Sequence, residues 1–169
     1  MTLEPVPDDL ARETLAYRRA LGAFATGVCV VTARTSEGAL GITINSFTSV
    51  SLEPRLILCC LHEQSERWAV FAAADHFAVH VLPAHARDLA ARFARGVCDL
   101  SPEEIGGKND EAPRLKEAVA RFDCRTHERI QMGDHLVIVG EVTGFEATDG
   151  DSLLFHRGRY GSSEGLIGS

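Results

Sequence analysis

The chain has 169 residues, and its 17 lysines and arginines against 24 aspartates and glutamates give a formal net charge of −7. Hydrophobic residues make up 45% of the chain and charged residues 24%, which excludes wholesale disorder and fibrous repeats. The acidic balance disfavours broad binding to nucleic acid, since that affinity depends on clustered lysines and arginines. No apolar run approaches the roughly 18 residues of a membrane span, and the acidic start does not resemble a signal peptide. We therefore expect a cytoplasmic protein that binds neither nucleic acid nor membrane.

The first half of the chain is predicted to begin with a helix and to continue mainly as strands. Apolar residues recur at helical spacing over residues 8–24, which predicts an amphipathic helix. The β-branched run at 28–33 is typical of a strand, and a second strand at 40–46 would complete a hairpin. After Pro54, residues 56–61 form an unbroken apolar run, which predicts a strand that is buried on both faces.

The second half is predicted to alternate strands, turns and short helices. In chain order we expect a helix at 65–74, a strand at 77–82, a helix at 84–95, a polar loop at 96–113, long strands at 120–131 and 136–147, a short strand at 153–155 and a glycine-rich tail from residue 158. Because short turns join most strands and the helices do not alternate regularly, the order favours a closed or nearly closed antiparallel barrel. A doubly wound parallel sheet is disfavoured.

The cysteines and histidines do not form a metal-binding motif. The five cysteines lack a CxxC spacing and are predicted to be reduced thiols, mostly in apolar surroundings. They are Cys29, Cys59, Cys60, Cys98 and Cys124. His76 and His80 would share one face of a strand, but about 13 Å apart at roughly 3.3 Å per residue, which is too far for one ion. We expect no metal site.

A segment rich in hydroxyl and amide side chains lies between two apolar strands, at residues 41–54. By composition alone it is a serine- and threonine-rich strand end and turn. Alternatively, small hydroxyl and amide groups, together with backbone N–H groups around a turn, can bind a phosphate or a polar ring edge without net positive charge. An acidic protein that binds a nucleotide cofactor would need such a device.

Five sequence pieces, in order between about residue 15 and residue 161, point to one family. They are 24–32 (FATGVCVVT), 45–54 (NSFTSVSLEP), Cys60-Leu61 with Ser65 and Trp68, 133–135 (GDH) and 155–160 (FHRGRY). Together they resemble the short-chain flavin reductases that serve two-component flavin monooxygenases. The resemblance implies a mainly β fold with inserted helices, namely an antiparallel split β-barrel of Greek-key type that binds FMN. It also implies a homodimer, FMN or FAD as the flavin, and NADH or NADPH as the co-substrate.

The resemblance further implies an activity and a set of site residues. The activity is hydride transfer from NADH or NADPH to the flavin, which is then supplied to a partner monooxygenase. On the flavin side the implied residues are Thr43, Asn45, Ser46, Ser49, Val50, Cys60, Leu61, Ser65, Arg92 and Phe93. On the nicotinamide side they are His135, Arg159 and Tyr160.

Several of these assignments have structural alternatives. Ser65 also suits a helix N-cap, Phe93 also suits core packing, and His135 also suits a turn in which Asp134 fixes its tautomer. Ile44 is bulky where the family more often has a small residue. Because the flavin and the nicotinamide carry the hydride chemistry, we expect no essential proton-transfer residue, and His135 is the residue best suited to take part.

Two other functions remain open at the level of sequence. A flavin-binding electron-transfer or storage protein on the same barrel would oxidise NADH slowly. A relative of pyridoxamine-phosphate oxidase is the second, although the chain lacks an evident arginine- and lysine-rich set for two phosphates. For each of these functions we expect one domain over residues 1–169, with an N-terminal arm at 1–14 and a C-terminal tail at 162–169.

Overall fold

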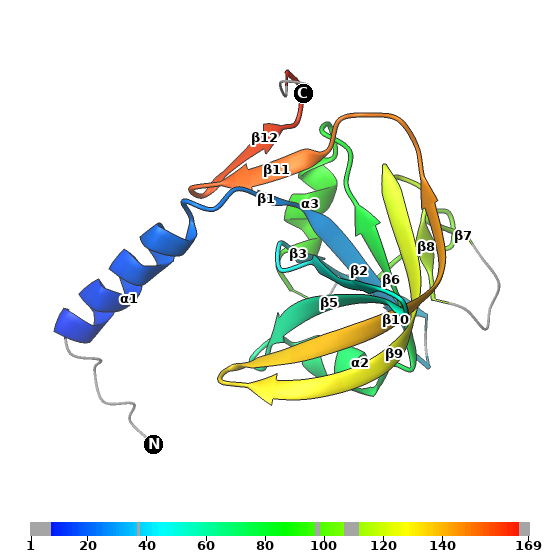
Figure 1. Ribbon diagram of the computed structural model, residues 1–169, viewed down its shortest axis with the longest axis horizontal. Coiled ribbons are helices and arrows are strands. Elements are labelled where there is room, and N and C mark those ends of the chain that lie inside the picture. Colours follow the sequence, from blue (N-terminus) through cyan, green and yellow to red (C-terminus); the bar gives the residue numbers. More distant parts are fainter. Residues whose placement is uncertain (1–7, 37, 97–98, 107–111, 166–169) are drawn as a thin grey trace.

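The computed structural model of the protein describes residues 8–36, 38–96, 99–106 and 112–165. The described chain is mainly β with a few helices, as predicted (Figure 1). In order, the elements are α1 (Asp8–Leu21), β1 (Thr26–Gly27), β2 (Cys29–Arg34), β3 (Ala39–Ile44), β4 (Thr48–Leu52), β5 (Arg55–His62), α2 (Trp68–Ala73), β6 (His76–Val81), α3 (Arg87–Phe93), β7 (Ile105–Gly106), β8 (Arg114–Leu115), β9 (Ala120–Met132), β10 (His135–Ala147), β11 (Leu153–His156) and β12 (Arg159–Ser162).

The strands form one large sheet and two small ones, and all of their pairings are antiparallel. The large sheet has seven strands in the order β3-β2-β6-β9-β10-β5-β4. A three-stranded sheet has the order β1-β11-β12, and β7 pairs with β8. The predicted antiparallel architecture is confirmed. Within the described residues, however, the edge strands β3 and β4 do not pair with each other, so the large sheet is open.

The large sheet is strongly curved, and it folds around a shared core (Figure 1). Ile42 and Ile44 of β3 lie in the same buried cluster as Ile57 and Cys59 of β5, although the two strands are far apart in the strand order. Strands β3 and β5 also contact each other directly. This curvature brings the ends of β3 and β5 together, and the candidate site lies there.

Strand β2 is buried on both faces. Val28, just before it, and Val30 pack against α3 in one cluster, whereas Cys29 and Val31 face the second cluster, which lies inside the curved sheet. The prediction that residues 56–61 would be buried on both faces is wrong, because β5 alternates between buried and half-buried residues. One face of β5 remains accessible near the candidate site.

Five strands were not predicted from the sequence, namely β1, β4, β7, β8 and β12, and two of them, β4 and β12, contain predicted site residues. Strand β4 lies within the serine- and threonine-rich segment at 41–54, where we expected a strand end and a turn, and β12 lies within the glycine-rich tail. Both are edge strands of their sheets. An edge strand pairs with another strand on one side only, so it can form with few apolar residues. Composition therefore did not reveal these two strands.

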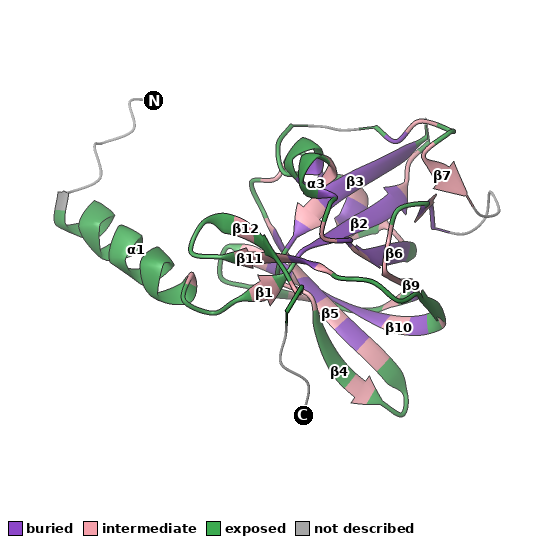
Figure 2. Ribbon diagram, turned by 90° about the horizontal axis from the view of Figure 1, so that it is seen from above, coloured by how far each residue is buried: buried purple, intermediate pink, exposed green. Residues whose placement is uncertain are grey.

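The first helix is present as predicted, and its last turn, with Arg18 and Arg19, borders a hollow that Arg157 and Gly158 also line. Helix α1 projects away from the sheets (Figure 2), and its apolar side chains are exposed. Those side chains include Leu10, Leu15, Tyr17 and Leu21. No helix among the described residues is long and apolar enough to cross a membrane.

Most of the cysteine prediction is confirmed. Cys29, Cys59 and Cys124 are buried, Cys60 is half-buried, and Cys98 lies outside the described residues. Burial raises the pKa of Cys29 and of Cys59 to about 12. These two thiols therefore stay protonated and serve as small apolar core residues.

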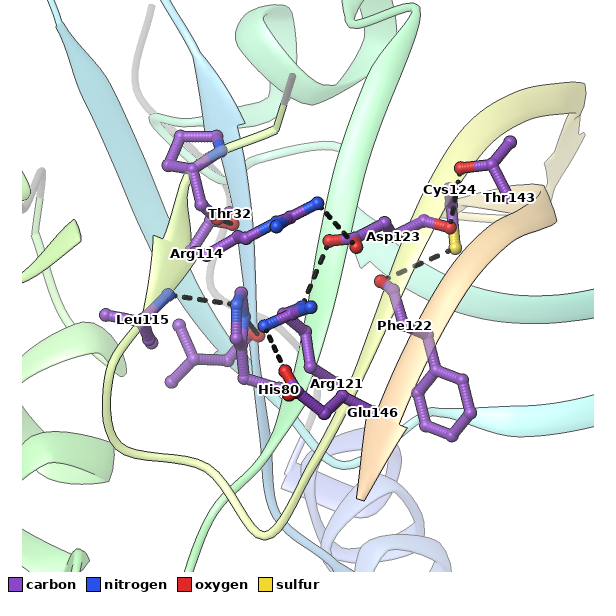
Figure 3. A network of polar contacts seen from close by, with 12 residues as sticks. Thr32, His80, Arg114, Leu115, Arg121, Phe122, Asp123, Cys124, Thr143 and Glu146 are labelled. Carbon is purple, nitrogen blue, oxygen red and sulfur yellow. Dashed lines mark hydrogen bonds and ion pairs between the residues drawn. The ribbon is translucent and has the colours of Figure 1, made fainter. Parts of the chain in front are cut away.

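A polar network surrounds β6 and β9, away from the candidate site (Figure 3). His80 is fully buried; its Nδ1 bonds the carbonyl of Val30 at 3.1 Å, and its Nε2 accepts the backbone N–H of Leu115 at 3.0 Å. Burial, aided by the positive charges of Arg121 and Arg114, lowers the pKa of His80 to about 4. His80 is therefore a neutral structural residue that ties β6 to its neighbours.

Candidate functional site

A cavity of about 680 Å³ opens where the ends of β3 and β5 meet the start of β10. Its size lies within the range of small-molecule sites. Seven of the thirteen residues predicted from the sequence to contact the flavin or the nicotinamide line it, namely Thr43, Asn45, Ser46, Cys60, Leu61, Ser65 and His135. The structure thus brings together residues that are up to 92 positions apart in the chain, from Thr43 to His135.

The segment after β3 is held against β5 by Ser46. Its hydroxyl accepts the backbone N–H of Cys60 at 3.0 Å and donates to the carbonyl of Cys60 at 3.0 Å. The hydroxyl of Thr43 likewise donates to the carbonyl of Ala90 at 2.8 Å. Because a hydroxyl has one proton, both side chains can offer a ligand only an acceptor, whereas the exposed amide of Asn45 can both donate and accept.

The floor of the cavity is organised by a buried arginine. Arg67 is 5% exposed, and its Nη1 donates to the carbonyls of Gly41 at 3.0 Å and Phe93 at 2.6 Å. Arg67 therefore joins β3 to the end of α3, directly before residues 94–96 of the lining. The hydroxyl of Ser65 accepts the N–H of Arg67 at 3.3 Å. Ser65 thus stabilises the turn before α2 and is not the N-cap of that helix, which begins at Trp68.

A carboxylate and two imidazoles lie at the β10 end of the cavity. Nδ1 of His135 lies 2.7 Å from Oδ1 of Asp134, and Nε2 of His62 lies 3.4 Å from Oδ2 of the same carboxylate. The hydrogen bond from His135 is the main cause that lowers the pKa of Asp134, and His62 adds to it. The predicted contact between Asp134 and His135 is confirmed, and His62 joins them in the lining.

A second, smaller cavity adjoins the first. It measures about 160 Å³ and is lined by Thr43, Ile44 and Asn45 on one side and by Phe155 and Tyr160 on the other. The rings of Phe155 and Tyr160 pack edge to face, with centroids 5.3 Å apart. Tyr160 also lines, with Arg159, an outer hollow of about 560 Å³ along β12. Asn45 therefore stands between a cavity that contains His135 and one that contains Tyr160.

Comparison with known proteins decides the family. The family described as flavin reductase like domain matches residues 21–164. The chain belongs to the flavin reductase family. This membership confirms the resemblance that the sequence motifs indicated.

Named relatives of the flavin reductase family agree with this assignment. FMN reductase (NADH) SmoA from Agrobacterium fabrum is 45% identical to the chain over 145 residues, which cover 86% of this chain and 83% of the relative. The reductase component of flavin-dependent trigonelline monooxygenase from Acinetobacter baylyi is 36% identical, with 90% of this chain and 50% of the relative covered. The chain therefore spans about half the length of that second relative.

A solved structure supports the same fold. The NADH:FAD oxidoreductase SgcE6 from Streptomyces globisporus, in complex with NAD and FAD fragments, matches with a TM-score of 0.79 and 36% identity. The match covers 92% of this chain and 94% of that one. The similarity therefore extends over nearly the whole described chain and is not confined to the cavity.

Four residues that the flavin reductase resemblance assigned to the flavin do not line the main cavity. Ser49 and Val50 lie exposed on the edge strand β4. Phe93 is fully buried in the core beneath α3, as its structural alternative predicted. Arg92 forms an ion pair with Glu104 and lowers the pKa of that carboxyl to about 2. Ile44 packs in the core and also borders both cavities.

Four charged or titratable residues of the lining were missed from the sequence. They are His62, Glu66, Arg67 and Arg95. Arg67 and Arg95 lie in the segments predicted as helices at 65–74 and 84–95, and only the folded chain shows that these two segments meet at the cavity. His62 had one available signal, because it directly follows Cys60-Leu61 at the end of a predicted strand.

Proposed function

We propose that the chain is an NAD(P)H:flavin oxidoreductase that transfers a hydride from NADH or NADPH to FMN or FAD. The observation that carries the proposal is the main cavity, in which polar residues of the flavin motifs and the imidazole of His135 line one space. The names of the relatives support it, since SmoA is an NADH-dependent FMN reductase and SgcE6 an NADH:FAD oxidoreductase.

The donor set of the cavity fits a flavin. The polar edge of a flavin ring carries both carbonyl acceptors and an N–H donor. The amide of Asn45 offers both kinds of partner, and the hydroxyls of Thr43 and Ser46 offer acceptors, because their own protons are used within the protein. Leu61 and Ile42 provide apolar surface in the same lining. We propose that these residues hold the ring.

The phosphate side of the site is proposed to lie at residues 94–96, after α3. Arg92 was the basic residue suggested by the resemblance, but it does not line the cavity. Arg95 lines the cavity three residues later, next to Gly96. We therefore propose Arg95 as the cation for a flavin phosphate, whereas Ser49, Val50, Arg92 and Phe93 remain predictions from the resemblance alone.

The nicotinamide side is proposed to lie at His135, with Arg159 and Tyr160 on the other side of Asn45. The hydride chemistry itself is supplied by the nicotinamide and the flavin when they are bound. The residues of this chain would hold the flavin ring and the nicotinamide ring at contact distance and exclude water from between them. An essential proton-transfer residue is not required, and the buried cysteine thiols do not supply one because burial raises their pKa.

Reduced flavin is proposed to pass to a partner monooxygenase. The support is the name of the relative from Acinetobacter baylyi, which is the reductase component of a flavin-dependent monooxygenase.

We also propose a cytoplasmic homodimer with a split-barrel fold. The core that β3 and β5 share supports the barrel, and the exposed apolar side chains of α1 support a second copy as their cover. Size-exclusion chromatography with light scattering tests the dimer, and a monomer at micromolar concentration would contradict it.

The proposed activity can be tested by following the loss of NADH absorbance with free FMN, FAD or riboflavin added. We expect multiple turnovers with at least one of these flavins, and a slower reaction with riboflavin because it lacks the phosphate. If the protein binds flavin tightly but catalyses at most one slow turnover, the storage function is correct and the proposed one is wrong.

A further inference from the structure

The carboxylate of Asp134 lies between two imidazoles from neighbouring strands. His62 ends β5 and His135 begins β10, and the two residues are direct partners in the antiparallel register. Their rings pack edge to face with centroids 4.9 Å apart. A backbone hydrogen bond also joins the two strand ends here, because the N–H of Glu63 donates to the carbonyl of Asp134 at 3.0 Å. The three side chains are therefore parts of one arrangement fixed by strand pairing.

The tautomer of His62 follows from its backbone contact. The N–H of Gln64 donates to Nδ1 of His62 at 3.0 Å, so this nitrogen acts as an acceptor. In a neutral imidazole the proton must then be on Nε2. Nε2 is the atom that faces Oδ2 of Asp134 at 3.4 Å, so His62 presents an N–H to the carboxylate.

The tautomer of His135 follows from the same carboxylate. Its Nδ1 lies 2.7 Å from Oδ1 of Asp134, and a carboxylate only accepts, so Nδ1 carries the proton. In the neutral ring Nε2 is left as an acceptor, at the edge of the cavity that the ring lines. A bound group that donates an N–H would satisfy this nitrogen, whereas a group that only accepts would not.

We propose that His62 is a positioning residue for the nicotinamide side: through Asp134 it holds His135 with Nδ1 protonated and Nε2 ready to accept the amide N–H of a nicotinamide carboxamide. This inference rests on the proposed function for its ligand, but not for its tautomers. Asp134 has 68% of its side chain exposed, so its orientation is not fixed by packing. The two imidazoles are the partners that fix it, one on each oxygen.

A merely structural role for His62 makes a different prediction. If His62 only stabilised the turn through Gln64, its replacement would change the free energy of unfolding and leave the His135 ring unaffected. Two substitutions separate these roles. In His62→Gln the side-chain amide nitrogen can still reach Asp134, whereas in His62→Asn the shorter side chain can accept from Gln64 N–H but cannot reach the carboxylate.

The experiment measures the imidazole ¹⁵N shifts of His135 in the ligand-free protein, together with the steady-state constants for NADH. We expect the Nδ1–H tautomer of His135 in the wild type and in His62→Gln. In His62→Asn we expect a mixture of tautomers and a three- to fivefold higher KM for NADH, with kcat and the Kd for flavin changed less than twofold. His62→Phe, which keeps the ring but has neither nitrogen, should repeat the His62→Asn result and replaces it if that variant does not fold.

The proposal is overturned if His62→Asn keeps the wild-type tautomer of His135 and the wild-type KM for NADH. It is also overturned if His62→Gln behaves like His62→Asn, because reach to Asp134 would then be irrelevant. A wild-type protein that does not oxidise NADH at all would contradict the proposed function. The ¹⁵N shifts would still show whether His62 sets the tautomer of His135.

Discussion

Two histidines of this protein, His80 and His135, each have a hydrogen-bond partner on Nδ1, but they differ at the second nitrogen. His80 is fully buried, and its Nε2 accepts the backbone N–H of Leu115. His135 has 42% of its side chain exposed and lines the main cavity, and its Nε2 has no hydrogen-bond partner within the described residues. The same type of side chain thus joins strands in one region and lines a cavity in the other.

This difference separates a structural histidine from the one that we propose to bind a ligand. Both nitrogens of His80 bond backbone groups inside the protein, at Val30 and Leu115, so its loss should be measured as lost stability. His135 satisfies one carboxylate at the surface, so its loss should be measured as lost ligand affinity. Each prediction below tests one side of this comparison.

The largest effect is expected at His80. His80→Ala leaves a cavity and removes the acceptor of the buried Leu115 N–H, and it should lower the free energy of unfolding by about 3 kcal/mol. The measurement is urea denaturation followed by circular dichroism. His76→Ala, on the same strand but exposed, is the control and should change the free energy by less than about 0.5 kcal/mol. Equal losses in the two variants would mean that burial of His80 does not matter.

Acid should destabilise the protein through the same residue. The pKa of His80 falls from its ordinary value of 6.5 to about 4 in the folded state, so the unfolded chain binds the proton first. This contribution to stability is complete above about pH 6.5 and declines as the pH falls toward 4, by about 3 kcal/mol in all. Denaturation curves at several pH values measure it. His80→Gln does not titrate there, and an unchanged slope in that variant would contradict the account.

The buried Arg67 should affect both the stability of the protein and the binding of flavin in the cavity. Arg67→Met removes two hydrogen bonds to the carbonyls of Gly41 and Phe93, and it should lower the free energy of unfolding by about 2 kcal/mol. It should also weaken flavin binding, because the bonds hold the segment before residues 94–96. Arg87→Met, at an exposed position of α3, is the matched control and should affect neither quantity.

The flavin side of the cavity should respond more weakly and without loss of fold. Asn45→Ala combined with Ser46→Ala should raise the Kd for FMN or FAD about tenfold, or about 1.4 kcal/mol, as measured by quenching of flavin fluorescence. The reason is the loss of the Asn45 amide and of the bonds that hold Cys60 in place. Thr143→Ala removes a hydroxyl outside the cavity and should bind as the wild type does. Undiminished affinity in the double variant would refute this placement.

Much of the fold was predictable from local pattern, but the meeting of distant segments was not. The long strands β9 and β10 and the helices follow from periodicity and turn residues. Strand β4 was hidden because an edge strand tolerates a run of serine and threonine. The antiparallel architecture was also predictable, whereas the open sheet depends on how far the curvature proceeds, which no local pattern encodes.

The same limit explains the candidate site. The motifs of the flavin reductase resemblance contain Asn45, Ser46, Cys60 and His135, so the sequence alone assigned these residues to one site. Arg67 could not be found in this way, because its role depends on carbonyls of β3 and α3 that approach only after folding. Arg92 shows the reverse error, since its basic character was visible but its partner Glu104, twelve residues away, was not.

The most direct test of the central claim compares His135→Ala with His85→Ala. Both residues are exposed imidazoles beside a carboxylate, but His85 pairs with Glu117 outside the cavity. We predict that His135→Ala raises the KM for NADH about fivefold, or about 1 kcal/mol, and leaves the Kd for flavin within about twofold. His85→Ala should change neither the KM nor the Kd. An unchanged KM for NADH with lost flavin affinity in His135→Ala would contradict the placement of the nicotinamide at His135.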